Sequence, residues 1–294
     1  MIITKLEGGL GNQLFQYAAG RRLAHARGVD LKLDISGLSN PNYRTMRHYE
    51  LAPFNVMQSF ASEKDIAKLA RPNSDLLSRL FHRILRKGEQ FPKSYIKEPH
   101  YHFDPRILDL PDGVYLDGYW QSERYFGDTT ELIRKELTLR EPPSGRNAEL
   151  AREIAECQAV SLHVRRGDYV NDEITHRVHG VCGMDYYARA VTYIANRVNV
   201  PVFFVFSDDP AWARENIKLH HPMQIVDHNG PECGYEDMRL MSLCRHHIIA
   251  NSSFSWWGAW LNPSHDKIVI APKRWFNSSD ADTSDLYPDS WVRL

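Results

Sequence analysis

Long apolar runs and paired cysteines are missing from this sequence, and both absences narrow the class of protein. The four cysteines are widely spaced and form no CxxC pair, so we expect reduced thiols rather than a disulfide framework or a cysteine zinc site. No run of about 18 apolar residues occurs, so a transmembrane helix is not predicted. The first residues, MIITKLEGG, lack the charged and then apolar pattern of a signal peptide. We therefore expect a cytoplasmic protein.

An excess of charge of one sign is missing as well. The 294 residues include 36 Lys and Arg against 37 Asp and Glu, for a formal net charge of −1. This balance argues against a nucleic-acid-binding surface, so no nucleic acid partner is expected. Hydrophobic residues make up 43%, which is typical of a globular protein with one large or two medium domains. Any anion that the protein binds must be held by a few local cations.

The start of the chain predicts a β-α-β unit with a glycine-rich turn. We expect a strand at 2–6, the turn GGLG at 8–11, and a helix over 12–27 that stops at Gly28. A second strand then ends at Asp34. The turn has only two of the three glycines of the dinucleotide fingerprint, so an NAD-dependent oxidoreductase is a weak alternative, with Asp34 at the place of a ribose-binding acid.

The middle of the chain, from about 40 to 140, is less regular. Within it, the segment 75–87 predicts an amphipathic helix with an apolar face of Leu, Phe and Ile flanked by Arg, His and Lys. The favoured interpretation is a helix that packs on its own domain. The alternative is peripheral contact with an anionic membrane.

A linker is predicted near REPPSGRN, residues 140–147, because Pro, Gly and Ser interrupt the helical pattern there. We place the domain boundary in it, which gives domains 1–145 and 146–294.

The second domain alternates apolar strands with helices. Strands are expected at 159–164, 201–207, 223–228, 246–250 and 267–272, and helices near 184–198, 210–217, 235–244 and 254–261. Apolar strands between helices predict an α/β domain with a parallel sheet covered on both faces.

Polar clusters follow three of these strands directly: RRGD at 165–168, SDD at 207–209 and NSS at 251–253. Parallel strands share one carboxyl edge, and ligands of open α/β sheets bind in the crevice outside that edge. The three clusters therefore predict one pocket.

Two of the clusters suit phosphate. Arg165 and Arg166 supply planar, permanently charged donors, and each charge-assisted bond is worth about 1.5–3 kcal/mol. Ser252 and Ser253 precede a helix whose first N–H groups and dipole attract an anion, although one of the two serines could also be a simple N-cap.

The third cluster suits a nucleoside. We expect one of Asp208 and Asp209 to cap the helix that begins at Pro210 and the other to bind a base or ribose. Together the clusters predict a nucleoside diphosphate ligand. No phosphate-binding P-loop or HExxH motif occurs, and the pair Asp280 and Asp282 lies in a Ser-rich loop, so no metal cofactor is expected.

Five segments, in this order and spacing, resemble those of a known family. They are GGLGNQLFQYAAG (8–20), GYWQSERYF (118–126), HVRRGDYV (163–170), FSDD (206–209) and NSSFSWWGAWLN (251–262). The sequence resembles the α-1,2-fucosyltransferases, glycosyltransferase family eleven. The resemblance implies a GT-B architecture of two Rossmann-like domains and GDP-L-fucose bound by the C-terminal domain. It also implies metal-independent, inverting transfer to the 2-hydroxyl of a terminal galactose.

The resemblance also assigns donor contacts to individual positions. It implies that Arg165 grips the diphosphate, His163 helps to hold the guanosine end and Arg166 orients the loop. The remaining donor-binding residues that it implies are Gly9, Gly11, Asn12, Asp208, Asp209, Ser252 and Ser253. The animal members of the family carry a membrane anchor that this sequence does not show, so we expect a bacterial, cytoplasmic member, with peripheral contact at the inner membrane as the alternative.

Catalysis requires neutralisation of departing GDP and removal of a proton from the acceptor. Arg165 is the candidate for the first task. Asp168 is either the base or an anchor that orients Arg165, and the sequence does not separate these roles. Glu173 and Asp172 are the other candidates for the base.

Acceptor recognition is assigned to the first domain and the cleft. Tyr119 and Trp120 are candidates to stack on a sugar, with Glu173 as a polar contact, although aromatic residues at this spacing are more often part of a core. Two alternatives share the arginine cluster: a fucosyltransferase of α-1,6 or protein O-linked type, and a nucleotide-sugar-binding protein without turnover.

Overall fold

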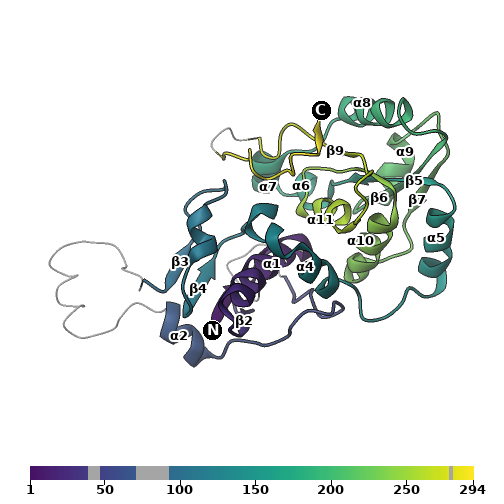
Figure 1. Ribbon diagram of the computed structural model, residues 1–294. Helices are drawn as coiled ribbons and strands as arrows, with labels where there is room; N and C mark the ends of the chain where they lie inside the picture. Colours follow the sequence, from purple (N-terminus) through teal and green to yellow (C-terminus); the bar gives the residue numbers. More distant parts are fainter. Residues whose placement is uncertain (39–46, 71–92, 278–280) are drawn as a thin grey trace. The chain divides into compact units, whose positions relative to one another are not determined.

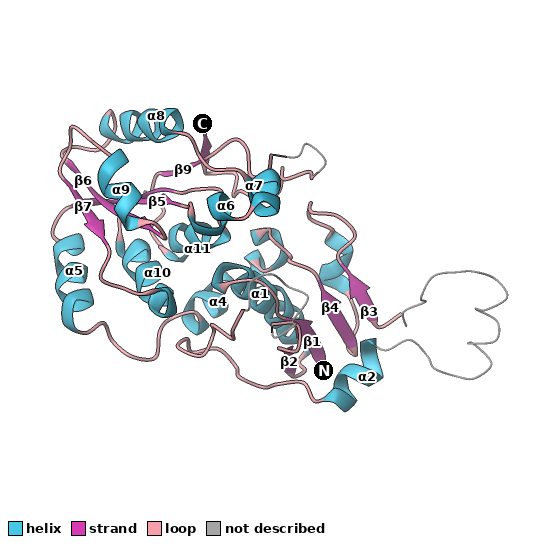
Figure 2. Cartoon of the chain, turned by 180° about the vertical axis from the view of Figure 1, so that it is seen from behind, coloured by secondary structure: helices cyan, strands magenta, loops and turns pink. Residues whose placement is uncertain are grey.

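A computed structural model of the chain describes residues 1–38, 47–70, 93–277 and 281–294. The chain divides into two compact units, Met1–Glu136 and Leu137–Leu294. Each unit contains a parallel sheet with helices (Figures 1 and 2). The first unit thus ends shortly before the segment 140–147, where the sequence placed the boundary.

The first unit has a four-stranded parallel sheet in the order β2-β1-β4-β3. Its strands are β1 (Ile2–Lys5), β2 (Leu31–Asp34), β3 (Tyr95–Lys97) and β4 (Val114–Asp117). Helix α1 (Leu10–Arg27) joins β1 to β2 and ends at Gly28, which takes the left-handed conformation with φ 64°. Because a side chain strains that conformation, glycine is the favoured residue there. The predicted β-α-β unit is confirmed.

The middle segment holds more structure than its composition predicted. Strands β3 and β4 lie in it, and each has four residues or fewer, too short for a clear alternating pattern. The other elements of this unit are α2 (Glu63–Ala70), α4 (Thr130–Glu136) and the 3₁₀ turns η1 (Pro105–Asp109), η2 (Glu123–Tyr125) and η3 (Gly127–Thr129). The segment 75–87, for which a basic amphipathic helix was predicted, lies outside the described residues.

The second unit has a six-stranded sheet in the order β10-β9-β8-β5-β6-β7, and every pairing is parallel. Its strands are β5 (Gln158–Val164), β6 (Pro201–Ser207), β7 (Met223–Val226), β8 (His246–Ile248), β9 (Val269–Ala271) and β10 (Val292–Arg293). Its helices are α5 (Gly145–Ala155), α6 (Gly167–Asn171), α7 (Glu173–His179), α8 (Met184–Ala195), α9 (Pro210–Asn216), α10 (Gly234–Leu243) and α11 (Ser253–Leu261), with the 3₁₀ turn η4 (Pro231–Cys233).

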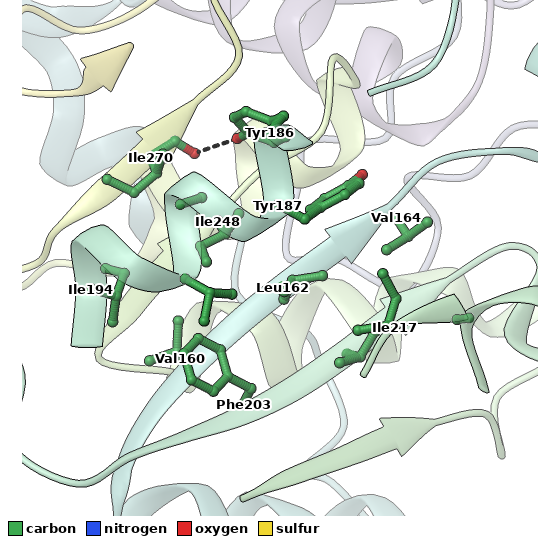
Figure 3. Packing of buried hydrophobic residues seen from close by; sticks show 14 of the residues in the cluster. Val160, Leu162, Val164, Tyr186, Tyr187, Ile194, Phe203, Ile217, Ile248 and Ile270 are labelled. Atoms are coloured by element: carbon green, nitrogen blue, oxygen red, sulfur yellow. Dashed lines mark hydrogen bonds between the residues drawn. The ribbon is translucent and has the colours of Figure 1, made fainter. Parts of the chain in front are cut away.

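Both faces of this sheet are buried, as the apolar strands predicted. On one face, Val160 and Leu162 of β5 and Phe203 of β6 pack with Tyr187 and Ile194 of α8 (Figure 3). On the other face, alternate residues of the same strands pack with helices α5 and α10. Full burial of each such side chain contributes about 1.5–3 kcal/mol, so the ends of β5 and β6 are held firmly. The predicted α/β fold with parallel sheets is confirmed.

Within the part of the chain that the structure describes, no helix combines the length and the apolar character needed to cross a bilayer.

Candidate functional site

Three polar clusters lie at the carboxyl ends of neighbouring strands in the second unit. Strand β5 pairs with β6 on one side and β8 on the other, so the residues after these strands share one edge. Arg165 Nη1, after β5, lies 2.9 Å from Asp208 Oδ2, after β6. The Tyr169 hydroxyl, in the turn that follows Arg165, donates to the Asn251 carbonyl, after β8, at 3.3 Å. The structure therefore brings the three clusters together.

Arg165 is the centre of this cluster. Its Nη2 donates to Asp168 Oδ1 at 2.6 Å, and its guanidinium carbon lies 5.1 Å from the centre of the Tyr169 ring. Burial disfavours its charge, but Asp208 and Asp168 raise the pKa of Arg165 overall. The result is a permanently charged, planar donor group that two carboxylates and one aromatic ring hold in place.

Arg166 points to a different neighbour. Its guanidinium carbon lies 3.9 Å from the centre of the Trp212 ring on α9, and its Nε lies 3.6 Å from Asp209 Oδ2. Its backbone N–H donates to Asp208 Oδ1 at 2.8 Å. These contacts fix the loop after β5 against α9, and the role of Arg166 in donor binding stays a prediction.

The two adjacent aspartates have different roles, and the expected helix cap is one of them. Asp209 caps α9, because its side chain accepts from the Trp212 N–H at 3.0 Å. Asp208 instead holds Arg165 and the backbone of Arg166. A Cβ atom on Gly167 would lie 2.4 Å from Asp208 Oδ2, so the close approach of this carboxylate requires a residue without a side chain.

Helix α11 begins beside the cluster with an open N-terminus. Ser252 occupies the N-cap position, but its side chain makes no capping bond. The helix is anchored by tryptophans: Trp256 and Trp257 are fully buried, and the Trp256 indole N–H donates to the Leu286 carbonyl at 2.9 Å. A helix N-terminus held this rigidly presents N–H donors to an anion.

Asn251 connects α11 to the segments around it. Its Nδ2 donates to the carbonyls of His179 at 2.9 Å and Trp275 at 3.2 Å. Its own carbonyl accepts from Tyr169, which lies against Arg165. One side chain thus ties the end of α7 to the start of α11.

His163 lies under the cluster, near the end of β5. Its side chain is buried, its Nδ1 is enclosed with no hydrogen-bond partner, and its ring centre is 5.5 Å from that of Phe254 on α11. Burial, and then the charge of Arg165, lowers the pKa of His163 to about 3, so the ring is neutral. A buried polar atom without a protein partner carries a desolvation cost, which sets His163 apart from the other residues of β5.

The other carboxylates after β5 are occupied elsewhere. Asp172 caps α7 by accepting from the N–H and the hydroxyl of Thr175, both at 2.8 Å. Glu173 is 86% exposed and pairs with Arg177 at 3.1 Å. The structure does not bring Glu173 to the arginine cluster, so the expectation of an acceptor contact or base at this position gains no support.

The glycine-rich turn of the first unit is shorter than expected, because α1 begins at Leu10 rather than at Asn12. Gly9 is the N-cap of α1 and Gly11 lies in its first turn, while Asn12 Oδ1 accepts from Gln121 Nε2 at 2.8 Å. This bond links the turn to the aromatic segment 118–126 after β4.

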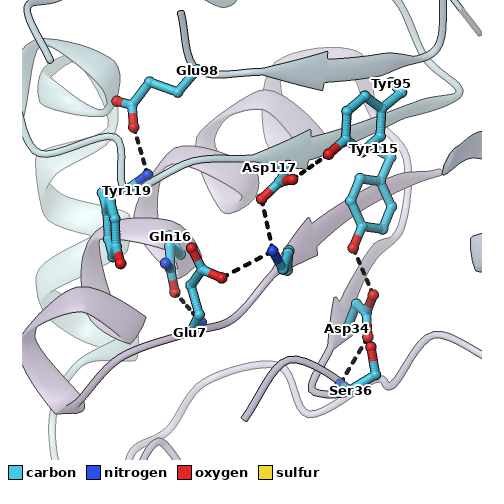
Figure 4. A network of polar contacts seen from close by, with 10 residues as sticks. Glu7, Gln16, Asp34, Ser36, Tyr95, Glu98, Tyr115, Asp117 and Tyr119 are labelled. Carbon is cyan, nitrogen blue, oxygen red and sulfur yellow. Dashed lines mark hydrogen bonds and ion pairs between the residues drawn. The ribbon is translucent and has the colours of Figure 1, made fainter. Parts of the chain in front are cut away.

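In that aromatic segment, Trp120 is fully buried and packs edge-on against Tyr125, with ring centres 5.5 Å apart. The prediction of Trp120 as an acceptor platform is therefore wrong, because no face of the ring is accessible, and the core alternative holds. Tyr119 is half-buried. The Glu98 carboxylate accepts from the backbone N–H of Tyr119 (Figure 4) and from that of Trp120. Burial raises the pKa of Glu98 to about 7.

Asp34, the residue at the place of a ribose-binding acid, is also occupied. Its two oxygens accept from the Tyr115 hydroxyl at 2.6 Å and the Ser36 N–H at 2.9 Å (Figure 4). These internal bonds weaken the dinucleotide interpretation.

Tyr169, His179 and the bridging role of Asn251 were not found from the sequence. Tyr169 and Asn251 lie inside quoted motifs, but their contacts join residues far apart in the chain. Among the residues that the structure describes, no group of three or more His, Cys, Asp or Glu side chains could hold a metal ion.

Comparisons with known proteins agree with this geometry. The profile of Glycosyl transferase family 11 matches residues 1–294. The chain is 36% identical to an Escherichia coli alpha-1,2-colitosyltransferase, over 100% of this chain and 99% of that protein. It is 37% identical to the E. coli O-antigen biosynthesis glycosyltransferase WbnK, over 98% of this chain and 99% of that protein.

More distant matches extend the comparison. Galactoside alpha-(1,2)-fucosyltransferase 1 of Lagothrix lagotricha is 32% identical over 50% of this chain and 42% of that protein. A mutant of Arabidopsis thaliana FUT1, solved in complex with GDP, shares the fold with a TM-score of 0.50 at 12% identity, over 93% of this chain and 71% of that chain. Since the profile and both E. coli relatives cover nearly the whole sequence, the chain belongs to glycosyltransferase family 11.

Proposed function

We propose that this glycosyltransferase transfers L-fucose from GDP-β-L-fucose to the 2-hydroxyl of a terminal galactose in a glycan, with inversion and without a metal. Family membership supports the reaction class, and the activities for which the relatives are named support the α-1,2 linkage. The observation that carries the proposal is the position of Arg165 at the end of β5, held by Asp168 and Asp208 beside the N-terminus of α11.

The donor site is assigned to the second unit. Arg165 binds the diphosphate. Its hydrogen bonds to the diphosphate oxygens strengthen as negative charge develops on departing GDP, because these bonds are charge-assisted. Ser252 and Ser253 place the first N–H groups of α11 on the same phosphates. The family resemblance assigns His163 to the nucleoside end of the donor.

Asp168 is assigned the anchoring role of the two that the sequence left open. One Asp168 oxygen accepts from the Arg165 guanidinium at 2.6 Å. This bond orients the remaining guanidinium N–H donors toward the diphosphate. Asp208 does the same from β6.

The acceptor is assigned to the first unit. Tyr119 is the aromatic residue proposed to contact the sugar, because Trp120 is enclosed in the core. The turn with Gly9, Gly11 and Asn12 is assigned to the donor by the family resemblance.

The acceptor that we propose is a galactose-terminated glycan of the O-antigen type, since one relative is named for O-antigen biosynthesis. We propose a cytoplasmic enzyme. Peripheral contact at the inner membrane through the segment 75–87, which lies outside the described residues, stays the less favoured alternative.

The deciding experiment incubates the purified protein with GDP-fucose and a panel of β-galactosides and determines the product linkage by NMR. An α-1,2 product supports the proposal, whereas an α-1,6 product assigns the other regiochemistry. GDP binding by calorimetry without any product indicates a binding protein, and NAD binding without GDP binding indicates the oxidoreductase. GDP-colitose is tested in parallel, because one full-length relative is named for colitose transfer.

A further inference from the structure

The proposed reaction needs a group that removes the proton of the acceptor hydroxyl, and the carboxylates after β5 are poorly placed for it. Asp168 is bonded to Arg165, and Asp172 caps α7. Glu173 is largely exposed and pairs with Arg177. A general base must direct a lone pair into the site, within hydrogen-bond reach of the proton it accepts. A different side chain of the same cluster meets this requirement better.

His179, the last residue of α7, belongs to the arginine cluster through an aromatic stack. Its ring centre lies 4.7 Å from that of Tyr169, and the two planes are inclined by only 15°. The same Tyr169 ring lies against the Arg165 guanidinium. Phe276 contacts the imidazole as well, with ring centres 5.2 Å apart. The Tyr169 ring therefore connects His179 to Arg165, the group that is assigned to the diphosphate.

The backbone of His179 is fixed independently of this stack. Its carbonyl accepts from Asn251 Nδ2 at 2.9 Å, and Asn251 directly precedes the N-cap of α11. The helix stops at Gly180, whose φ of 62° ends the α-helical run. The imidazole is thus positioned relative to both phosphate-binding elements.

The imidazole itself has unused hydrogen-bonding capacity. Its Nδ1 is enclosed in the protein and has no partner, and neither ring nitrogen is hydrogen-bonded to a described residue. The residue is only half-buried. Because Nδ1 is enclosed, Nε2 is the nitrogen that a substrate would reach.

We infer that His179 is the general base of the transfer, an inference that rests on the fucosyltransferase function proposed above. The acceptor 2-hydroxyl gives its proton to Nε2 of His179 while its oxygen forms a bond to C1 of fucose. The C1–O bond to the diphosphate breaks, and GDP leaves with the electron pair and is held by Arg165. The imidazolium then returns its proton to solvent.

The charges around His179 suit this cycle. Burial lowers the pKa of His179, and Arg165 adds to that effect, while Asp168 acts in the opposite direction. The imidazole is therefore neutral and able to accept a proton near pH 7, and Asp168 stabilises the imidazolium once it forms. Tyr169 is the remaining titratable side chain in contact, and burial raises its pKa to about 12, so it stays neutral. Phe276 and Asn251 carry no charge.

The test compares His179→Gln with wild type, and His265→Gln, at an exposed histidine after α11, is the matched control. We expect His179→Gln to lower kcat for galactoside transfer by roughly 10²–10⁴-fold, the usual contribution of a general base. The affinity for GDP, measured by calorimetry, is expected to change less than about threefold. The acid limb of the pH profile of kcat/KM is expected to disappear in the variant.

Azide provides a second readout, because this anionic nucleophile attacks C1 without losing a proton. We expect His179→Gln to form fucosyl azide at a rate within about tenfold of wild type. His179→Phe, which keeps a ring against Tyr169, is expected to behave in the same way if the loss is chemical rather than structural.

The inference is wrong if His179→Gln transfers fucose to a galactoside at a rate within about threefold of wild type. It is also wrong if azide restores turnover in Asp168→Asn but not in the His179 variants. A wild-type protein that forms no fucoside would instead refute the proposed function.

Discussion

Arg165 shows how much of the site depends on a single side chain. It contacts Asp168 and Asp208 and lies against Tyr169. We expect Arg165→Ala to lower kcat/KM by on the order of 10²-fold or more, because the departing diphosphate loses its fixed cation. Steady-state assays at several GDP-fucose concentrations measure the effect. Arg177→Ala, which removes an exposed arginine on α7, is the control, and a nearly wild-type Arg165→Ala enzyme would contradict the assignment.

His163 makes the stability of the fold depend on pH. Its pKa is about 3 in the folded protein because of burial and then Arg165, against an unfolded value near 6.5. Below pH 6.5 the unfolded state binds a proton at this residue and the folded state does not. The free energy of unfolding therefore falls as the pH falls, and above pH 6.5 this contribution is absent. The loss approaches about 1.4 kcal/mol per pH unit, or about 2 kcal/mol between pH 6.5 and 5.

Urea unfolding of wild type and His163→Gln at a series of pH values measures this contribution. The free energy of unfolding of the variant is expected to fall less steeply between pH 6.5 and 5. His265→Gln is expected to keep the wild-type slope, and equal slopes in all three proteins would show that His163 does not titrate in this way.

Single residues also mark where sequence reasoning ends. The arginines and serines could be proposed as site residues because their chemistry and their place after apolar strands are visible in the sequence. The burial of Trp120 could not be predicted, because an aromatic residue in a polar loop is equally suited to packing in a core and to stacking on a sugar. The sequence did not show which of Asp208 and Asp209 caps α9, since both precede that helix. The structure shows it through the contact between Asp209 and the Trp212 N–H. The stack of His179 on Tyr169 joins two helices that the sequence did not predict.

At the scale of elements, apolar content decided what could be predicted. Strands β5 and β6, with seven residues each, were placed within one residue of their ends. Strand β10 has two residues, and helices α6 and α7 have five and seven, which is too short for a periodic pattern. These short helices follow the RRGD motif and carry Tyr169 and His179, so part of the site was missed with them.

The start of α6 depends on the absence of a side chain at Gly167. A Cβ there would lie 2.4 Å from Asp208 Oδ2, and Asp208 is held on both sides by Arg165 and the Arg166 backbone. We expect Gly167→Ala to displace this carboxylate and raise the KM for GDP-fucose by about tenfold, with a smaller change in kcat. Gly127→Ala, where a Cβ meets no atom within 4 Å, is the control for kinetics and Tm. Unchanged donor KM in Gly167→Ala would show that Asp208 does not position Arg165.

For the whole molecule, the family was recognised from five motifs because they span the chain, and the matching profile confirms it. The fold followed from the alternation of strands and helices in the second half. The irregular middle of the chain resisted prediction because its short strands are stabilised by pairing with β1 and with each other, which is a property of the folded unit.

The electrostatics of the second unit also set an expectation for metal dependence. In the proposed reaction, Arg165 and the N-terminus of α11 supply the positive charge that a leaving diphosphate needs. We expect the transfer rate to be the same in EDTA as in added Mg²⁺ or Mn²⁺, measured as GDP release under initial-rate conditions. A loss of tenfold or more in EDTA, restored by either metal, would contradict this expectation.

The central place of β5 in its sheet affects how the chain folds during synthesis. Its partners β6 and β8 both come later in the sequence, so a ribosome releases the apolar residues of β5 before either partner exists. Pairings between distant segments form slowly, and an apolar strand without partners is prone to aggregate. The apolar residues of β5 are therefore without a partner strand for longer during synthesis than those of β1, whose partner β2 follows directly after α1.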